Sequence, residues 1–74
     1  MNEIKIGALY KHYKTEKLYK IIGIAKHSET LEDLVIYEAQ YENPTSKLWA
    51  RPLSMFLESV EFKGKKQPRF NLID

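Results

Sequence analysis

The sequence predicts a mainly β fold, in which five short strands close into a small SH3-like barrel with one short helical turn before the last strand. Three observations predict this fold. Apolar and polar residues alternate in five runs within about 60 residues. Tight turn signals separate the runs. The sequence Pro-Leu-Ser-Met-Phe then interrupts the alternation before the last run.

The first two strands are predicted at residues 7–14 and 18–27, where apolar and polar side chains alternate. Thr15-Glu16 is interpreted as the hairpin turn between them, although it lacks the glycine that such turns favour. In the second run, Gly23 is expected to mark a bulge or a bend.

The middle of the chain allows two interpretations. Residues 28–33 carry hydroxyl and carboxylate side chains suited to a loop or one helical turn. The run at 34–41 favours a strand, because it is rich in β-branched and aromatic residues such as Val35 and Ile36. Apolar residues also recur there at helical intervals. The alternative is therefore an α+β fold, a three-stranded sheet with a helix near 31–40.

The second half of the chain contains the clearest turn signal, Asn-Pro-Thr-Ser at residues 43–46. A fourth strand at 47–52 is expected to end at its proline, which cannot donate a hydrogen bond to a neighbouring strand. Residues 53–56 are interpreted as one helical turn and 58–62 as the last strand. A basic C-terminal tail at 63–74 follows.

Composition restricts what the chain can be. Its 74 residues are expected to form a single domain, residues 1–74, which is too small for a large catalytic architecture. Without cysteine it has neither disulfides nor a cysteine-ligated zinc, so one tryptophan, five tyrosines and three phenylalanines must supply much of the core. No apolar stretch reaches the roughly 20 residues of a membrane helix, and the first residues do not resemble a signal peptide. We expect a cytoplasmic location and no membrane partner.

The charge changes sign along the chain. Residues 5–27 hold six lysines and one glutamate, residues 28–61 hold seven acidic residues, and residues 62–70 hold four basic residues. If segments 5–27 and 62–70 meet on one face, they form a surface for RNA or DNA. In the second segment this hypothesis uses Lys63, Lys65, Lys66 and Arg69. The simpler interpretation is solvated strand edges, where lysine prevents aggregation.

Polar loop residues beside aromatic strand ends indicate a ligand site. The leading hypothesis is a non-enzymatic binding module that recognises an unknown protein, peptide or small-molecule ligand through an aromatic and polar groove. Arg51 supplies a guanidinium fork suited to a carboxylate or phosphate, although an ion pair with Glu29 or Glu38 is the simpler interpretation. The residues assigned to the groove are Tyr10, His12, His27, Ser28, Glu29, Thr30, Trp49, Arg51 and Arg69.

Neither catalysis nor metal binding has a specific signal. His12 and His27 are the two histidines, and no ligand spacing accompanies them, so no metal and no cofactor is expected. His12 is interpreted as a partly buried, hydrogen-bonded residue. A hydrolase-like or metal site around His27 is a remote alternative, since Ser28 beside it on a strand would point to the opposite face. No catalytic residue is assigned, and the polar residues 28–30 are interpreted as fixing their own turn.

Four motifs occur in order along the chain: Tyr-x-His-Tyr-Lys at 10–14, Ala-x-His-Ser-Glu-Thr-Leu-Glu at 25–32, Trp-x-Arg-Pro-Leu-x-Met-Phe at 49–56 and Pro-Arg-Phe at 68–70. With these motifs the chain, from about Gly7 to Phe70, resembles a family of small bacterial proteins known as a domain of unknown function. The resemblance implies a compact, mostly β, SH3-like domain in the cytosol and no established catalytic activity. The sequence departs from the family at Thr15-Glu16, where similar proteins place a glycine turn.

Overall fold

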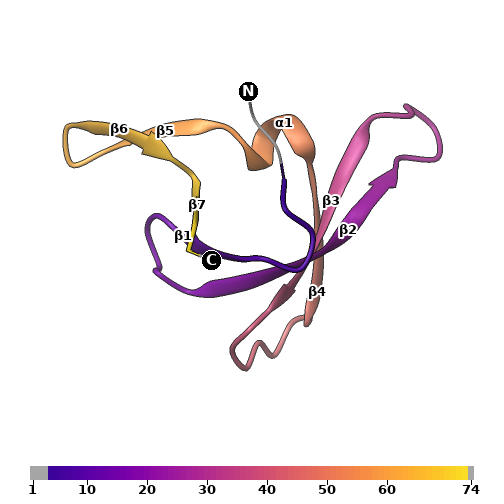
Figure 1. Ribbon diagram of the computed structural model, residues 1–74, viewed down its shortest axis with the longest axis horizontal. Coiled ribbons are helices and arrows are strands. Elements are labelled where there is room, and N and C mark those ends of the chain that lie inside the picture. The colour runs from indigo at the N-terminus through magenta and orange to yellow at the C-terminus, as the bar shows by residue number, and fades with distance from the viewer. Residues whose placement is uncertain (1–3, 74) are drawn as a thin grey trace.

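A bent antiparallel sheet and a separate hairpin, joined by one short helix, make up the computed structural model, which describes residues 4–73 (Figure 1). The elements in chain order are β1 (Leu9–His12), β2 (Leu18–Lys26), β3 (Asp33–Ala39), β4 (Leu48–Pro52), α1 (Leu53–Phe56), β5 (Ser59–Phe62), β6 (Lys65–Pro68) and β7 (Phe70–Leu72).

The prediction of a mainly β fold with one short helical turn is confirmed. The large sheet has the order β4-β3-β2-β1-β7, with antiparallel neighbours throughout, and α1 occupies the predicted residues 53–56. The alternative helix near 31–40 is wrong, because β3 pairs with β2 on one side and β4 on the other. Hydrogen bonds to two neighbouring strands favour the strand here, although the apolar residues of this segment also fit helical spacing.

The sheet does not close into a barrel. β4 and β7 are its two edges, and within residues 4–73 no ladder joins them. The reason lies in the last third of the chain, where β5 pairs with β6 rather than with the large sheet. The predicted closed barrel is therefore corrected to a bent five-stranded sheet with a hairpin beside it.

The segment predicted as a basic tail is structured. Lys63 and Gly64 both have positive φ, 55° and 78°, and form a two-residue turn that pairs β5 with β6. The chain then returns to the large sheet, where β7 pairs with β1. β6 consists of three consecutive polar residues and a proline, without apolar alternation, so its sequence pattern did not predict a strand.

A bulge bends β2 at the predicted glycine. Ile21 pairs with Tyr37 and Gly23 pairs with Ile36, so Ile22 is the extra residue and is exposed. A bulge increases local twist. It lets β2 follow the curve of the sheet around the core.

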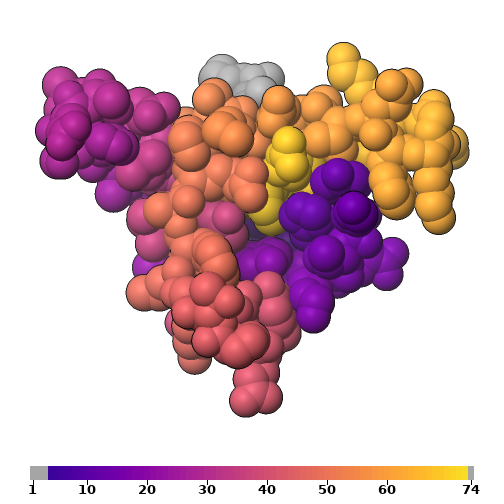
Figure 2. Space-filling model, turned by 180° about the vertical axis from the view of Figure 1, so that it is seen from behind, coloured from indigo at the N-terminus to yellow at the C-terminus, as the bar shows by residue number. Residues whose placement is uncertain are grey.

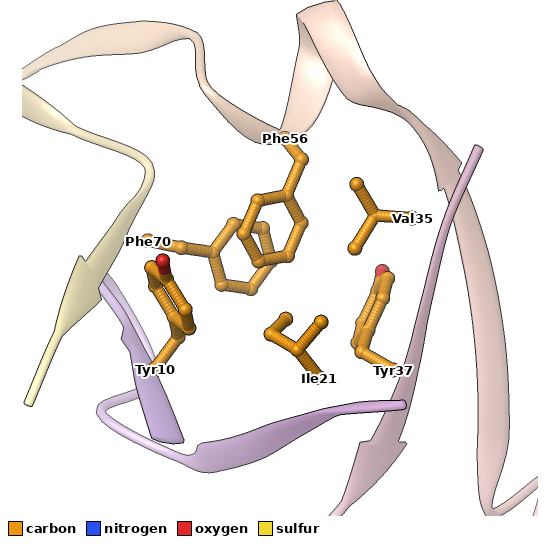
Figure 3. Packing of buried hydrophobic residues seen from close by; sticks show 6 residues of the cluster. All are labelled: Tyr10, Ile21, Val35, Tyr37, Phe56 and Phe70. Carbon is orange, nitrogen blue, oxygen red and sulfur yellow. The ribbon is translucent and has the colours of Figure 1, made fainter. Parts of the chain in front are cut away.

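The hydrophobic core lies inside this curve, under α1 (Figure 3). Phe56 from α1 and Phe70 from β7 stack face to face, with ring centroids 4.2 Å apart. Tyr10 and Tyr37 contact Phe56 from either side, at 5.4 and 5.5 Å. Four of the six residues in this cluster are aromatic, which agrees with the expectation from composition. The cluster comprises Tyr10, Ile21, Val35, Tyr37, Phe56 and Phe70.

Two hairpins project from opposite sides of the molecule. Figures 1 and 2 show the β2–β3 hairpin on one side and the β5–β6 hairpin on the other, with the β3–β4 loop at a third corner. A site formed at one of these corners is therefore separate from the tips of the other two.

None of the helices within the described residues has the length and apolar character to cross a membrane.

Candidate functional site

A histidine side chain fixes the turn between β1 and β2. The Nδ1 atom of His12 accepts hydrogen bonds from the backbone N–H groups of Lys14, at 3.2 Å, and Thr15, at 3.4 Å. The Glu16 N–H donates to the His12 carbonyl at 3.0 Å, and Glu16 adopts a φ of 61°. The predicted turn is confirmed, and Glu16 occupies the left-handed position that favours glycine.

The turn between β2 and β3 repeats this pattern. His27 Nδ1 accepts from the backbone of Glu29, at 3.1 Å, and Thr30, at 3.3 Å, and Leu31 has a φ of 64°. The Leu31 N–H donates to the His27 carbonyl at 2.9 Å. The Thr30 hydroxyl also accepts from the Glu32 N–H at 3.3 Å, and the Thr15 hydroxyl accepts in the same way from the Lys17 N–H. Of the three residues 28–30 expected to fix this turn, Thr30 does so with its side chain, and His27 provides the other acceptor.

A pocket of about 250 Å³ opens beside the first of these turns. Its wall combines the β1–β2 turn, the β3–β4 loop, the inner face of β4 and the start of β7. Segments far apart in sequence therefore build it together. The lining residues are His12, Thr15, Tyr19, Tyr37, Tyr41, Asn43, Trp49, Arg51 and Phe70.

Edge-to-face aromatic contacts hold the walls of the pocket. Tyr19 lies 5.3 Å from Tyr37, 5.5 Å from Tyr41 and 5.8 Å from Phe70, measured between ring centroids. The Tyr19 and Tyr41 hydroxyls share a hydrogen bond of 2.7 Å. The indole N–H of Trp49 donates to a backbone carbonyl at 3.0 Å, which fixes the ring. These contacts preorganise the site.

Arg51 is the one charged residue that lines the pocket. Its Nε–H donates to the Tyr37 hydroxyl at 3.4 Å, and its guanidinium lies 5.7 Å from the centre of the Phe70 ring. None of the described lining residues is acidic. The expected ion pair of Arg51 with Glu29 or Glu38 is wrong, because among residues 4–73 the ion pairs are Lys26–Asp33 and Arg69–Glu58. Arg51 pairs with the buried Val35, whereas Glu38 has the opposite parity on β3 and Glu29 lies in the β2–β3 turn.

Burial sets the protonation of the titratable groups in the pocket. The pKa of His12 is lowered by burial and by the positive charges of Arg69, Arg51 and Lys14. The imidazole is therefore neutral at pH 7. The pKa of Tyr19 is raised, first by burial and then by its hydrogen bond to Tyr41. The Tyr19 phenol therefore stays protonated, and Arg51 is the charged side chain in the lining.

The structure brings together three of the nine residues assigned from sequence, namely His12, Trp49 and Arg51. Tyr10 lies in the core instead. Arg69 binds Glu58 at 2.9 Å, next to the pocket rather than in it. The remaining four, residues 27–30, lie in the β2–β3 turn and do not line the pocket.

Sequence reasoning assigned none of the three tyrosines in the wall to the site. Tyr19, Tyr37 and Tyr41 are placed by the register of β2, β3 and the following loop. Their spacing along the chain gives no indication that they surround one space. Alternation along the strands could have identified these tyrosines, because it places them on the same inward face as Trp49. β3 and β4 pair at Tyr37 and Trp49.

Neither a metal centre nor a hydrolase-like site is supported around His27. No group of three metal-ligating side chains gathers within residues 4–73. His27 Nδ1 is engaged by its own turn, and no hydrogen bond joins His27 to Ser28 in the described part of the chain. Acyl transfer requires a base that can take the proton of its nucleophile.

A larger hollow of about 510 Å³ lies along residues 38–43 and Lys47. The end of β3 and the β3–β4 loop form all of its lining. It is lined by two carboxylates, Glu38 and Glu42, and one lysine, Lys47, and Tyr41 is its one aromatic lining residue. We therefore regard the smaller aromatic pocket, which five strands position, as the candidate site.

Comparisons with known proteins place this fold in a family. The profile of a family described as "protein of unknown function (DUF1653)" matches residues 8–72. The chain is also similar to the crystal structure of a DUF1653 protein from Bordetella bronchiseptica. The two are 31% identical with a TM-score of 0.87, over 96% of this chain and 88% of that chain. No curated protein matches the sequence.

Proposed function

This chain belongs to the DUF1653 family, and we propose that it is a non-enzymatic binding module whose site is the aromatic pocket at His12, Trp49 and Arg51. Its ligand is a small molecule, or a peptide or protein partner that inserts one side chain or chain end. We further propose that it acts in the bacterial cytoplasm, in line with a bacterial relative and a cysteine-free sequence.

The observation that supports this proposal most is the state of Arg51. Its two terminal nitrogens make no hydrogen bond or ion pair with residues 4–73, although the side chain is half-buried among aromatic rings. Its terminal N–H groups are therefore free to donate hydrogen bonds to a molecule in the pocket. A ligand with hydrogen-bond acceptors would provide a partner for them.

The size of the pocket fits this class of function. Small-molecule sites typically occupy about 300–1,000 Å³ and combine apolar walls with a few polar groups. At about 250 Å³ this pocket lies just below that range. It suits a single ring or one amino-acid side chain rather than a nucleotide.

A fragment screen tests the proposal. Trp49 is the single tryptophan, so its fluorescence and its indole N–H resonance report on the pocket alone. We expect ring-containing fragments to shift the resonances of Trp49, Tyr19 and Arg51, and to leave those of Lys65 in the β5–β6 hairpin unchanged. If no fragment moves the pocket resonances, or if all shifts fall on residues 63–69, the proposal is wrong.

Nucleic-acid binding is the second candidate function, because one contact joins the two basic segments. The rings of Tyr13, in the β1–β2 turn, and Phe62, at the end of β5, meet edge to face at 5.3 Å. Lys14 and Lys63 follow these residues directly and are exposed. Within the described residues, none of the lysines at 14, 63, 65 and 66 forms an ion pair. Such a surface suits phosphate contacts.

Salt dependence separates this candidate from the pocket. If it is right, a single-stranded RNA binds with an affinity that falls as salt rises, and replacing Lys63, Lys65 and Lys66 by Gln reduces both affinity and salt slope. The matched comparison replaces one lysine at a time: Lys63→Gln on this surface and Lys47→Gln, which removes the same charge outside both basic segments. Equal losses of affinity in these two single variants would mean that only net charge matters and would reject this surface.

A further inference from the structure

We infer that the ligand of this pocket carries a carboxylate attached to a flat aromatic or apolar group, with the carboxylate bound by Arg51 and His12. The inference rests on the proposed function, which it narrows to one ligand chemistry. It is carried by the charge of the pocket, by its free hydrogen-bond donors and by its walls.

The charge requires an anion. Arg51 is the charged lining residue, and Lys17 adds a second cation at the rim, with its Nζ 4.4 Å from the centre of the Tyr41 ring. None of the described lining residues is a carboxylate. The planar fork of a guanidinium matches the two oxygens of a carboxylate.

The donor set fits a carboxylate as well. His12 Nδ1 already accepts two backbone N–H bonds, so the neutral ring is assigned its proton on Nε2. No hydrogen bond from that Nε2 to another residue is found within residues 4–73. The ring lines the pocket against Phe70, at 5.2 Å between centroids. His12 therefore offers a second donor beside the free Arg51 nitrogens.

The tyrosine pair contributes a third donor. When two hydroxyls share one hydrogen bond, one proton is used and the other remains free. Tyr19 and Tyr41 share such a bond at 2.7 Å, and Tyr41 also accepts from the Asn43 amide at 3.1 Å. One phenolic proton is thus left for a ligand oxygen. The walls around it are aromatic faces and edges, which suit a flat group rather than a branched polar one.

Five probes test the ligand chemistry on the intact chain. Benzoate is compared with benzamide, its neutral isostere, and with phenyl phosphate. A peptide ending in phenylalanine is used with a free and with an amidated carboxyl group. We expect benzoate to bind at least about tenfold more tightly than benzamide, as for a charge-assisted hydrogen bond. The free-acid peptide should exceed the amidated one by a similar factor.

The pKa of His12 gives a readout that mere occupancy of the pocket does not move. A bound carboxylate favours the imidazolium, so benzoate should raise the pKa of His12, observed by NMR at its Cε1 proton. Benzamide should not. The groups that face His12 are Lys14 on its own turn, Arg51 on β4 and Arg69 before β7, together with Tyr19 on β2. The Cε1 proton of His27, at the far turn, is the internal reference for ligand-induced change.

Substitutions locate the carboxylate. Arg51→Gln should weaken benzoate binding about tenfold or more, Arg51→Lys should weaken it less, and neither should alter the affinity for benzamide. Lys20→Gln removes the same charge from an exposed position outside the pocket and should leave binding unchanged. If Arg51→Gln does not fold, the benzoate and benzamide comparison in the unmodified chain decides.

The outcomes separate the inference from the proposed function. Equal binding of benzoate and benzamide, or tighter binding of phenyl phosphate, overturns the inference that the ligand is a carboxylate. The proposed binding function would stand in that case. Failure of all probes also overturns the carboxylate, and the fragment screen then decides whether the pocket binds at all. Tighter binding of the free-acid peptide than of benzoate assigns the carboxylate to a protein C-terminus. The reverse order assigns it to a free aromatic acid.

Discussion

The β1–β2 turn and the β2–β3 turn have the same local structure and different surroundings. In each, a histidine Nδ1 accepts two backbone N–H groups, a threonine follows three residues later, and the next residue adopts a positive φ. His12 nevertheless lines an aromatic pocket beside Arg51, whereas His27 lies in a projecting hairpin. The local sequence determines the turn, and the strands around it determine whether the histidine belongs to a site.

The largest effect is expected from the residue that supports the first turn. Phe70 is buried, stacks on Phe56 and contacts His12. Phe70→Ala should lower the free energy of unfolding by about 3–5 kcal/mol, measured by urea denaturation. Leu31→Ala, at the exposed second turn, should change it by less than about 0.5 kcal/mol. Similar losses in both variants would mean that the second turn is packed as tightly as the first.

The next prediction concerns what the two turns share. His12→Ala and His27→Ala each remove the acceptor of two backbone N–H groups and should each cost about 1 kcal/mol of unfolding free energy. Asparagine can accept the same bonds in a turn, so His12→Asn and His27→Asn should restore most of that stability. Urea denaturation of the four variants measures both effects. Failure of asparagine to rescue either turn would show that the imidazole contributes mainly by packing.

Removing the side chain at each left-handed position should stabilise the chain. Glu16→Gly and Leu31→Gly relieve φ values of 61° and 64° and should each gain up to about 1 kcal/mol, seen as a higher Tm. Glu16→Ala and Leu31→Ala keep the Cβ atom and serve as controls without this gain. A fall in Tm for either glycine variant would contradict the prediction.

The smallest expected effect is a difference between the two turns in how their histidines make stability depend on pH. Because the folded-state pKa of His12 is lowered, the unfolded chain binds a proton more readily than the folded chain. This contribution is fully present above the ordinary histidine pKa of about 6.5 and is lost as the pH falls below it. His12→Asn should therefore lose less stability than the unmodified chain between pH 7.5 and 5.5. His27→Asn retains His12 and should lose as much stability over this pH range as the unmodified chain. The Tm at each pH measures both effects.

The sequence predicted the elements better than their assembly. The positions of the first four strands, of α1 and of the bulge at Gly23 could be predicted, because alternation, turn residues and glycine act locally. The open sheet could not be predicted, because it depends on β5 pairing with β6 rather than with the large sheet. β6 and β7 were missed because their charges resemble a solvated tail and their pairing depends on the two-residue turn at Lys63-Gly64.

The candidate site was predicted in part for a similar reason. Residues 27–30 were assigned to the groove as polar loop residues beside aromatic strand ends, but they lie in the β2–β3 turn and do not line the pocket. Arg51 and Trp49 were recognised by chemistry, as a fork next to an aromatic ring. Tyr19 and Tyr41 belong to the same pocket only through the pairing of strands, which a single sequence does not display.

The position of Phe70 near the end of the described chain has a consequence for synthesis. Its ring completes the stack with Phe56, and it also lines the pocket beside His12. A nascent chain that has reached β5 therefore holds an aromatic cluster without its central ring and a pocket without one wall. Folding of this domain is expected after translation of nearly all of it, with β7 as the strand that closes the core. Arresting translation before and after Phe70 leaves the ribosome, and probing each nascent chain with a protease, would reveal protection only in the longer one.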